Sequence, residues 1–249
     1  MNISPEAGVS RFLRGFIMEN TTLSAPDPNG IIPLSPGALS AENHGHKKSF
    51  GHFAWIYDLA QKYWVRPRIH KADPRRHGEI LSNMLKPFQK CRVLDVACGT
   101  GAAMAYLDKS NHYTGLDLSY SMLKRAVKKG RKKKFAAARF IHGNAEEPLF
   151  AKGAFDLVVM DTALHLIPVY DKALAETARI LKHGGTFVCS VPILGIDARF
   201  DARWKDIMAR SGVHGLTLEK LEQACANHRL IFSHHASNGG VLYSLAQKG

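Results

Sequence analysis

The sequence contains no uninterrupted apolar run of the roughly 18–20 residues that a membrane-spanning helix requires. A secretory signal is also missing, because Glu6, Arg11, Arg14 and Glu19 interrupt the first 20 residues. These absences argue against an integral helical membrane protein. They predict a cytoplasmic protein, with peripheral attachment to a membrane surface left open.

Cysteine is scarce: the 249 residues include four, and no two of them form a C-x-x-C pair. This spacing argues against a zinc site and against a disulfide scaffold, and it favours reduced thiols in a cytosol. The histidine pairs His44/His46 and His234/His235 lack a third ligand at a suitable spacing. We therefore predict that the protein holds no metal.

Acidic residues are missing between Leu118 and Ala145, although the whole chain has 21 Asp and Glu against 34 Lys and Arg. Nine cations fall in this stretch and account for most of the formal net charge of +13. This basic cluster has three interpretations: a solvated helix face, a contact with an anionic membrane, or a contact with RNA. It consists of Lys124, Arg125, Lys128, Lys129, Arg131, Lys132, Lys133, Lys134 and Arg139.

An apolar fraction of 45% and a charged fraction of 22% are ordinary for a globular protein and exclude disorder of the whole chain. Residues 24–46 are rich in Ser, Pro, Gly and Asn, which predicts an irregular linker. Before it, apolar residues from Val9 to Ile17 share one helical face, which either docks on the protein or lies on a membrane. We expect an extension at 1–48 and one domain at 49–249, divided into a helical lid at 49–90 and a core at 91–249.

From residue 91 onward, short apolar segments alternate with segments of helical periodicity. This alternation predicts a doubly wound α/β sheet, in which ligands bind outside the carboxyl ends of the strands. Strands are predicted at 92–96, 113–116, 139–142, 155–160, 186–191, 230–234 and 241–246. Helices are predicted at 76–85, from about 102, and at 119–129, 170–181 and 217–227.

A glycine-rich turn follows the first predicted strand of the core, in the segment VLDVACGTG at 93–101. Gly99 and Gly101 allow a sharp turn and a close approach of the backbone to a ligand. Asp117 comes 22 residues after Asp95, at the end of the second predicted strand, where a carboxylate can accept both hydroxyls of a ribose. Together these features indicate a ligand that contains adenosine.

The turn does not match a dinucleotide fingerprint, because Met104 stands where G-x-G-x-x-G requires a small residue. Asp95 also disfavours a pyrophosphate, since a carboxylate repels phosphate. A carboxylate suits a ligand with an ammonium group instead. S-adenosylmethionine carries an ammonium group, a sulfonium and a ribose, so it is the cofactor that we expect.

Five segments resemble class I S-adenosylmethionine-dependent methyltransferases of the small-molecule type, similar to the UbiE and methyltransferase-11-like family. The resemblance covers about residues 91–191, with the motifs in order. It implies a Rossmann-like sheet of seven strands, mostly parallel with an antiparallel last strand, and helices on both faces. The segments are VLDVACGTG (93–101), GLDLSYSML (115–123), HGNAEE (142–147), FDLVVMDTALHLIP (155–168) and ARILKHGGTFV (178–188).

The resemblance also implies roles for single residues. Two positions depart from the family's pattern without removing cofactor binding: Ala97 replaces a frequent glycine, and Asn144 stands where many members have Asp. The methionine portion would be held by Asp95, Ala97, Cys98, Gly99, Thr100 and Gly101, the ribose by Asp117, the adenine by Leu118, Met122, Asn144 and Ala145, and the methyl end by Asp161, Thr162 and the residues up to His165.

A sulfonium methyl is already activated, so catalysis requires mainly alignment of the acceptor and exclusion of water. A base is needed only where the acceptor carries a proton of high pKa. The candidates are His165, Asp161 and Tyr57. His165 also suits a pocket wall, and Tyr57 also suits contact with the cofactor or simple core packing.

The sequence indicates the methyl acceptor less directly than it indicates the cofactor. Aromatic residues concentrated at 50–64, together with the segment at 193–215, predict a lid over an apolar or aromatic, lipid- or quinone-like molecule. RNA is a less favoured acceptor, because the basic cluster would end roughly 15–20 Å from the cofactor edge along a helix. A non-catalytic, membrane-peripheral protein that binds the cofactor is the remaining alternative.

Overall fold

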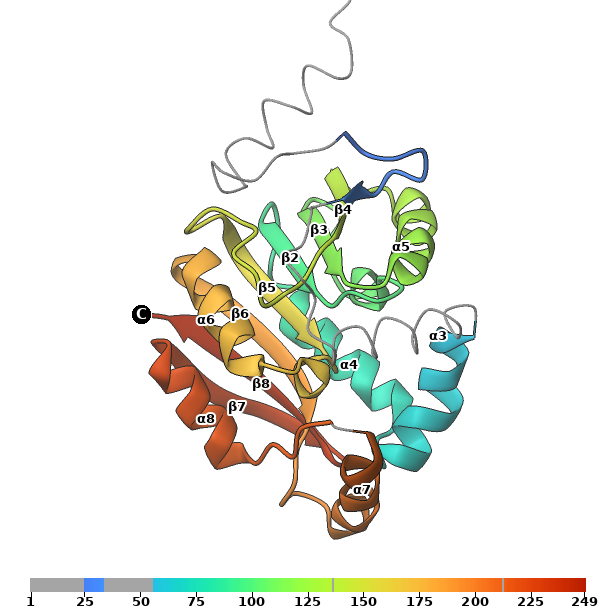
Figure 1. Ribbon diagram of the computed structural model, residues 1–249, viewed down its shortest axis with the longest axis vertical. Coiled ribbons are helices and arrows are strands. Elements are labelled where there is room, and N and C mark those ends of the chain that lie inside the picture. The colour runs from blue at the N-terminus through green and yellow to red at the C-terminus, as the bar shows by residue number, and fades with distance from the viewer. Residues whose placement is uncertain (1–24, 34–55, 136, 212) are drawn as a thin grey trace, which may run out of the picture.

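The computed structural model describes residues 25–33, 56–135, 137–211 and 213–249. Within them the chain forms one eight-stranded sheet with the strand order β1-β4-β3-β2-β5-β6-β8-β7 (Figure 1). The strands are β1 (Ile32–Pro33), β2 (Arg92–Val96), β3 (His112–Asp117), β4 (Ala137–His142), β5 (Phe155–Asp161), β6 (Leu181–Pro192), β7 (Leu230–Asn238) and β8 (Val241–Lys248).

The sheet is parallel from β1 to β6, and β8 runs antiparallel to both of its neighbours. This topology confirms the predicted doubly wound class. β2 pairs with β3 on one side and with β5 on the other, so the strand order reverses between β2 and β5. Ligands of such sheets bind at this reversal, beyond the carboxyl ends of the strands.

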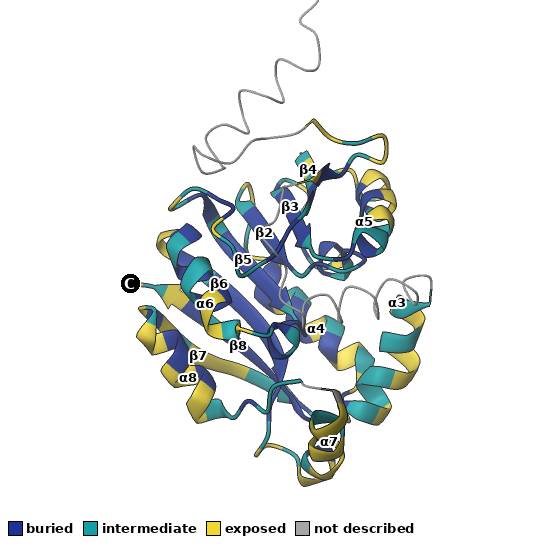
Figure 2. Cartoon of the chain, viewed as in Figure 1, coloured by how far each residue is buried: buried dark blue, intermediate teal, exposed yellow. Residues whose placement is uncertain are grey.

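Helices cover both faces of the sheet, and the central strands β2, β3 and β5 are mostly buried between them (Figure 2). Leu174 of α6 and Leu221 of α8 belong to one apolar core, whereas Leu81 of α4 and Leu123 of α5 belong to the core on the other face. The helical segments are α3 (Tyr57–Ala60), η1 (Gln61–Ile69), α4 (Pro74–Leu85), η2 (Ala102–Ala105), α5 (Tyr120–Lys133), η3 (Leu164–Leu166), α6 (Tyr170–Ile180), α7 (Ala198–Ser211) and α8 (Leu218–Asn227).

The eighth strand, β1, corrects the expected count of seven. It lies inside the segment that was expected to be an irregular linker, and it pairs with the edge strand β4. Ile31 and Ile32 are almost fully buried there, and Asp27 accepts a hydrogen bond from the hydroxyl of Tyr120. The two residues of β1 cover part of the edge of β4. Their pairing satisfies backbone donors and acceptors that this edge would otherwise expose.

One helical prediction also needs correction. The helix expected from residue 102 is only the short turn η2, because Asp108 accepts from the N–H of Ser110 and starts a tight turn before β3. The expected lid at 193–215 contains the full helix α7. The division at residue 48/49 stays a prediction, and residues 1–24 and 34–55, including the face from Val9 to Ile17, lie outside the described residues.

Helix α3 continues directly into η1, whose turns are wider than those of an α-helix. Pro67 within η1 has no N–H to donate, and the N–H of His70 reaches back five residues to Val65. Wide turns of this kind are rare and occur often at functional sites. No helix among the described residues is long and apolar enough to cross a membrane.

Candidate functional site

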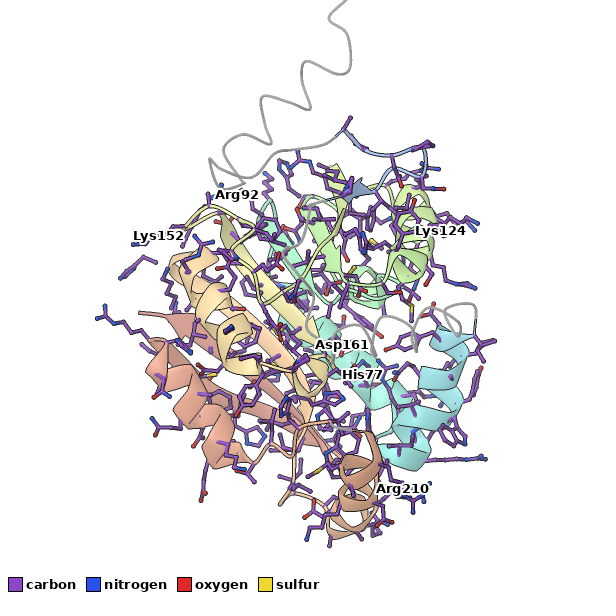
Figure 3. All side chains as sticks on the ribbon, viewed as in Figure 1. His77, Arg92, Lys124, Lys152, Asp161 and Arg210 are labelled. Atoms are coloured by element: carbon purple, nitrogen blue, oxygen red, sulfur yellow. The ribbon has the colours of Figure 1, made fainter. Side chains whose placement is uncertain are left out.

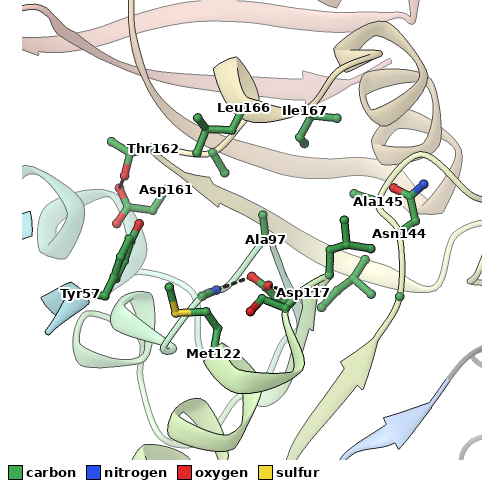
Figure 4. A pocket seen from close by; sticks show the side chains of 16 residues that line it. Tyr57, Ala97, Asp117, Met122, Asn144, Ala145, Asp161, Thr162, Leu166 and Ile167 are labelled. Atoms are coloured by element: carbon green, nitrogen blue, oxygen red, sulfur yellow. Dashed lines mark hydrogen bonds between the residues drawn. The ribbon is translucent and has the colours of Figure 1, made fainter. Parts of the chain in front are cut away.

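A cleft of about 820 Å³, its open mouth included, lies beyond the carboxyl ends of the central strands (Figure 4). Its walls come from the turn after β2, the end of β3, the loop after β4 and the end of β5. Helix α3 adds Tyr57 from the side. The lining residues are Tyr57, Ala97, Gly99, Leu116, Asp117, Leu118, Ser119, Met122, Gly143, Asn144, Ala145, Asp161, Thr162, Ala163, Leu166 and Ile167.

The glycine turn leaves room for a ligand on one side and packs tightly on the other. At Gly99 the φ angle is +55°, and an added Cβ would approach only Cε1 of Tyr57, at 4.0 Å. At Gly101 the φ angle is +74°, and an added Cβ would lie 2.2 Å from the methyl of Met104. Gly99 therefore borders open space in the cleft, whereas Gly101 borders the side chain of Met104 and has a φ angle that favours glycine.

The carboxylate of Asp117 is fixed by backbone donors on both sides of the cleft floor. It accepts from the N–H of Gly99 and from the N–H of Ser119, each at 2.7 Å. Burial raises the pKa of Asp117 to about 6, against the opposing effect of these two bonds. The remaining lone pairs of an ionised Asp117 suit the two hydroxyls of a ribose.

Beside Asp117 the cleft has apolar walls formed by Leu118, Met122 and Ile167. Asn144 lies at its edge, where Oδ1 accepts from the N–H of Glu146 at 3.1 Å. This geometry fits a flat nucleobase that lies between apolar side chains and has an amide group at its edge. The open space at Gly99, the carboxylate of Asp117 and these walls together fit S-adenosylmethionine.

At the other end of the cleft, Asp161 is held by three groups. Oδ1 accepts from the hydroxyl of Ser190 at 2.6 Å, while Oδ2 lies 3.5 Å from Nε2 of His77 and 3.6 Å from a guanidinium nitrogen of Arg66. Burial alone would raise the pKa of Asp161, but these partners hold it well below its usual range. Asp161 is therefore a stable anion and a weak proton acceptor.

Tyr57 faces this end of the cleft, and its hydroxyl accepts from the side-chain amide of Gln61 at 3.0 Å. Burial raises the pKa of Tyr57 to about 12, although Arg66 opposes the shift. The phenol keeps its proton at neutral pH, so it serves as a hydrogen-bond donor rather than as a base.

The structure brings ten of the predicted site residues to the cleft and places five elsewhere. Asp95 is 2% exposed and accepts from the hydroxyl of Tyr113 at 2.7 Å, and burial raises its pKa to about 7. The residues outside the lining are Asp95, Cys98, Thr100, Gly101 and His165, and their roles stay predictions.

His165 lies within η3, after β5 as expected, but is buried against a second group of side chains. Its ring centroid lies 5.5 Å from that of Trp204 and 6.3 Å from that of His70. His77, Arg66, His70 and Trp204 were not predicted as site residues. The one sequence signal for them was the position of Arg66 and His70 shortly after the aromatic-rich segment at 50–64.

The cleft lies within a region that is similar to known methyltransferases. Residues 94–189 match the family model described as a methyltransferase domain. The phthiotriol/phenolphthiotriol dimycocerosates methyltransferase of Mycobacterium tuberculosis is 37% identical over 99 residues, which make up 39% of this chain and 36% of that protein. The demethylmenaquinone methyltransferase of Bacillus velezensis is 37% identical over 102 residues, 39% of this chain and 44% of that protein. The match therefore spans less than half the length of these curated relatives.

Solved structures share the fold over a larger part of the chain. A geranyl diphosphate C-methyltransferase from Streptomyces coelicolor, crystallised with S-adenosyl-L-homocysteine, aligns with a TM-score of 0.63 over 86% of this chain and 100% of that chain, at 15% identity. The [4+2]-cyclase SpnF aligns with a TM-score of 0.64 over 86% of this chain and 97% of that chain, also at 15% identity. At these identities the likeness concerns the fold alone.

Proposed function

Because this chain carries a class I S-adenosylmethionine-dependent methyltransferase domain, we propose that it transfers the methyl group of S-adenosylmethionine to a small molecule. The observation that supports this most is the pair formed by Gly99 and Asp117. Gly99 opens the turn toward the cleft, and Asp117 is fixed beside it by backbone N–H groups. This pairing supplies an acceptor for ribose hydroxyls next to space for the rest of the cofactor.

S-adenosylmethionine supplies a methyl group that its sulfonium already activates. The chain's own residues then have to hold the acceptor in line and keep water out. Tyr57 covers one side of the cleft, and the stable anion Asp161 orients Arg66 and His77 beyond it. No side chain of the lining is a strong base, which favours an acceptor atom that is nucleophilic without deprotonation by Asp161 or Tyr57.

Calorimetric titration of S-adenosylhomocysteine into wild-type protein and Asp117→Ala tests this proposal. We expect micromolar binding to the wild type and loss of binding in the variant. Asp206→Ala is the matched control, because Asp206 is an exposed carboxylate on α7. Wild-type protein that fails to bind S-adenosylhomocysteine would refute the proposed cofactor site.

The acceptor that we propose is apolar, in the class of lipids or quinones. Two observations support this class: the curated relatives act, by their names, on dimycocerosates and on demethylmenaquinone, and the cleft walls near Asp161 are apolar at Ala163, Leu166 and Ile167. Transfer of labelled methyl into the lipid extract, rather than the aqueous extract, of cells tests the class.

We further propose that α3 and η1 touch an anionic membrane surface, from which an apolar acceptor would enter. Leu59 and Tyr63 are 59% and 62% exposed, Trp64 is half exposed, and Lys62 lies over the ring of Tyr63. Exposed aromatic and aliphatic side chains beside cations are typical of interfacial helices. Co-sedimentation with vesicles containing phosphatidylglycerol should fall in the triple variant Leu59→Ser, Tyr63→Ser, Trp64→Ser, and equal binding would contradict the contact.

RNA as the acceptor is a weaker alternative. Lys124, Lys128, Arg131 and Lys132 are exposed on α5, which begins at the cleft and carries its densest charge at its far end. RNA binding by this face would be steeply salt-dependent. Indifference to RNA at low salt would remove this alternative. A second alternative is a non-catalytic protein that binds the cofactor, and transfer of labelled methyl to any cell component would remove it.

A further inference from the structure

Beyond Asp161, a group of buried polar atoms has no hydrogen-bond partner among the residues that the structure describes. The atoms lie among side chains from η1 and its C-terminal end, from α4 and from α7, which meet at the carboxyl end of the sheet. We call these residues the polar cluster. Its unpartnered atoms are Oε1 of Gln61, Nε of Arg66, Nδ1 of His70 and Nε1 of Trp204, and His77, whose Nε2 lies 3.5 Å from Asp161, completes the cluster.

The members of the polar cluster lie close to one another and to the cleft. The rings of His70 and Trp204 have centroids 5.7 Å apart, and Nδ1 of His77 lies 2.7 Å from the hydroxyl of Tyr243. His77 and Asp161 lie side by side, where α4 passes the end of β5 (Figure 3). Asp161 lines the cleft and also contacts His77 and Arg66, so the two sites share this residue.

Several unpartnered polar atoms in one place indicate a site for a bound molecule. Buried polar groups in folded proteins are almost always paired, and the few exceptions often mark a functional site or an ordered water. His70 and His77 are 3% and 2% exposed, and Trp204 is 3% exposed, so bulk water does not reach these side chains freely. A bound molecule that donates and accepts hydrogen bonds would satisfy the cluster.

The chemistry of the cluster defines that molecule. Nε of Arg66 and Nε1 of Trp204 can only donate, which requires an acceptor oxygen. Oε1 of Gln61 can only accept, which requires a hydroxyl. The charges of Arg66 and Asp161 balance each other, so the site disfavours a carboxylate or phosphate. Burial lowers the pKa of His70 to about 4, helped by Arg66, so His70 adds no charge at neutral pH.

We propose that the polar cluster binds a neutral oxygen function of the methyl acceptor, a ring hydroxyl or a carbonyl, and thereby determines which acceptors react. The inference rests on the proposed methyl transfer. Phe200 stacks on Trp204 with centroids 5.2 Å apart and supplies an apolar surface beside the donors. An aromatic ring carrying a hydroxyl combines the two requirements, whereas a hydrocarbon satisfies only one.

The test uses 1-naphthol, with naphthalene as the matched probe that lacks oxygen and 1-naphthoate as the charged one. The indole N–H signal of Trp204 in a ¹H–¹⁵N spectrum, assigned with Trp204→Phe, reports directly on a hydrogen bond to Nε1. In protein saturated with S-adenosylhomocysteine we expect 1-naphthol to move this signal, and to bind at least tenfold more tightly than naphthalene or 1-naphthoate.

Trp204→Phe and His70→Phe should each lower the affinity for 1-naphthol at least fivefold, while the affinity for S-adenosylhomocysteine stays as in the wild type. His183→Phe is the control, because His183 is exposed on β6, outside the cluster. Equal affinity for 1-naphthol and naphthalene, or an unmoved Trp204 signal, would overturn the inference and mean that water satisfies these atoms. If a variant fails to fold, the affinities of the wild-type protein for 1-naphthol, naphthalene and 1-naphthoate still test the inference. Failure of S-adenosylhomocysteine to bind would count against the proposed function instead, and the comparison of 1-naphthol with naphthalene in the protein without S-adenosylhomocysteine would then test the polar cluster separately.

Discussion

The hydroxyl of Thr100 donates a hydrogen bond of 2.5 Å to Oδ1 of Asp58, and this bond joins the glycine turn to helix α3. Nζ of Lys129 lies 3.1 Å from the other oxygen of the same carboxylate and 3.3 Å from the hydroxyl of Thr100. The three residues come from three elements that surround the cofactor end of the cleft. Their contacts fix the place of Tyr57, which precedes Asp58.

We predict that Asp58→Asn weakens S-adenosylhomocysteine binding by about two- to fivefold, the range expected for an exposed ion pair. The side chain of Asp58 is 54% exposed, so salt should screen the effect. Calorimetry at low salt and at high salt measures both quantities. An unchanged affinity at low salt would mean that α3 is held in place without this contact.

Ala97 adopts a backbone conformation that favours glycine, with a φ angle of +52°. A left-handed conformation costs an L-residue about 1–2 kcal/mol, whereas glycine loses about 0.5–1 kcal/mol in extra chain entropy. Ala97→Gly should therefore raise the free energy of unfolding by roughly 0.5–1 kcal/mol and leave cofactor affinity unchanged. Thermal unfolding measures the first quantity. A lower melting temperature would show that the methyl of Ala97 contributes packing that outweighs the strain.

Asp95 makes stability depend on pH, because burial raises its pKa to about 7 in the folded protein, from 3.8. The folded state then binds more protons than the unfolded state between about pH 4 and pH 7, so stability falls as the pH rises through this window. Three pKa units correspond to about 4 kcal/mol as an upper limit. Asp95→Asn should match the wild type near pH 4 and be more stable by roughly 2–4 kcal/mol at pH 8.

Denaturant unfolding at both pH values measures this difference. A shallower slope should remain in Asp95→Asn, since burial also raises the pKa of Asp117 to about 6. Asp206→Asn, on the exposed surface of α7, should follow the wild-type curve. If Asp95→Asn is the less stable protein at pH 8, the carboxylate is ionised and stabilised by its hydrogen bond with Tyr113.

The sequence was sufficient for the class of the sheet and for the glycines and Asp117 that line the cleft, because both depend on local patterns. Apolar strands such as β5, and the glycines and Asp117 at strand ends, are recognisable without tertiary information. β1 was missed because two residues carry no periodicity. Its position depends on the free edge of β4, which only the folded sheet creates.

Asp95 shows why a correct motif can still mislead about the direction of a side chain. Gly115 lies opposite Asp95 in the neighbouring strand, and an added Cβ there would meet the ring of Tyr113 at 3.1 Å. The missing side chain leaves space in which the hydroxyl of Tyr113 reaches Asp95. The polar cluster was equally unpredictable, since Arg66, His77 and Trp204 meet only after three separate helical segments have packed.

The hairpin between β7 and β8 contacts the backbone of His70 and Lys71 at the end of η1, next to the polar cluster. At Gly239 the φ angle is +58°, and an added Cβ would lie 2.1 Å from the carbonyl oxygen of Lys71. The N–H of Gly240 donates to the carbonyl of His70 at 2.8 Å, so the hairpin and the end of η1 are in direct contact.

Gly184 is the matched control for Gly239, since its φ angle is +71° and an added Cβ would meet nothing within 4 Å. Gly184→Ala should lower the free energy of unfolding by roughly 0.5–1 kcal/mol, the cost of the left-handed conformation less the chain entropy that glycine loses. Gly239→Ala should lower it by about 3 kcal/mol or more, because overpacking adds to the same conformational cost. Denaturant unfolding of both variants isolates the steric part. Equal losses would mean that η1 can move away from the hairpin, and the positions of Arg66 and His70 would then not be fixed by this contact.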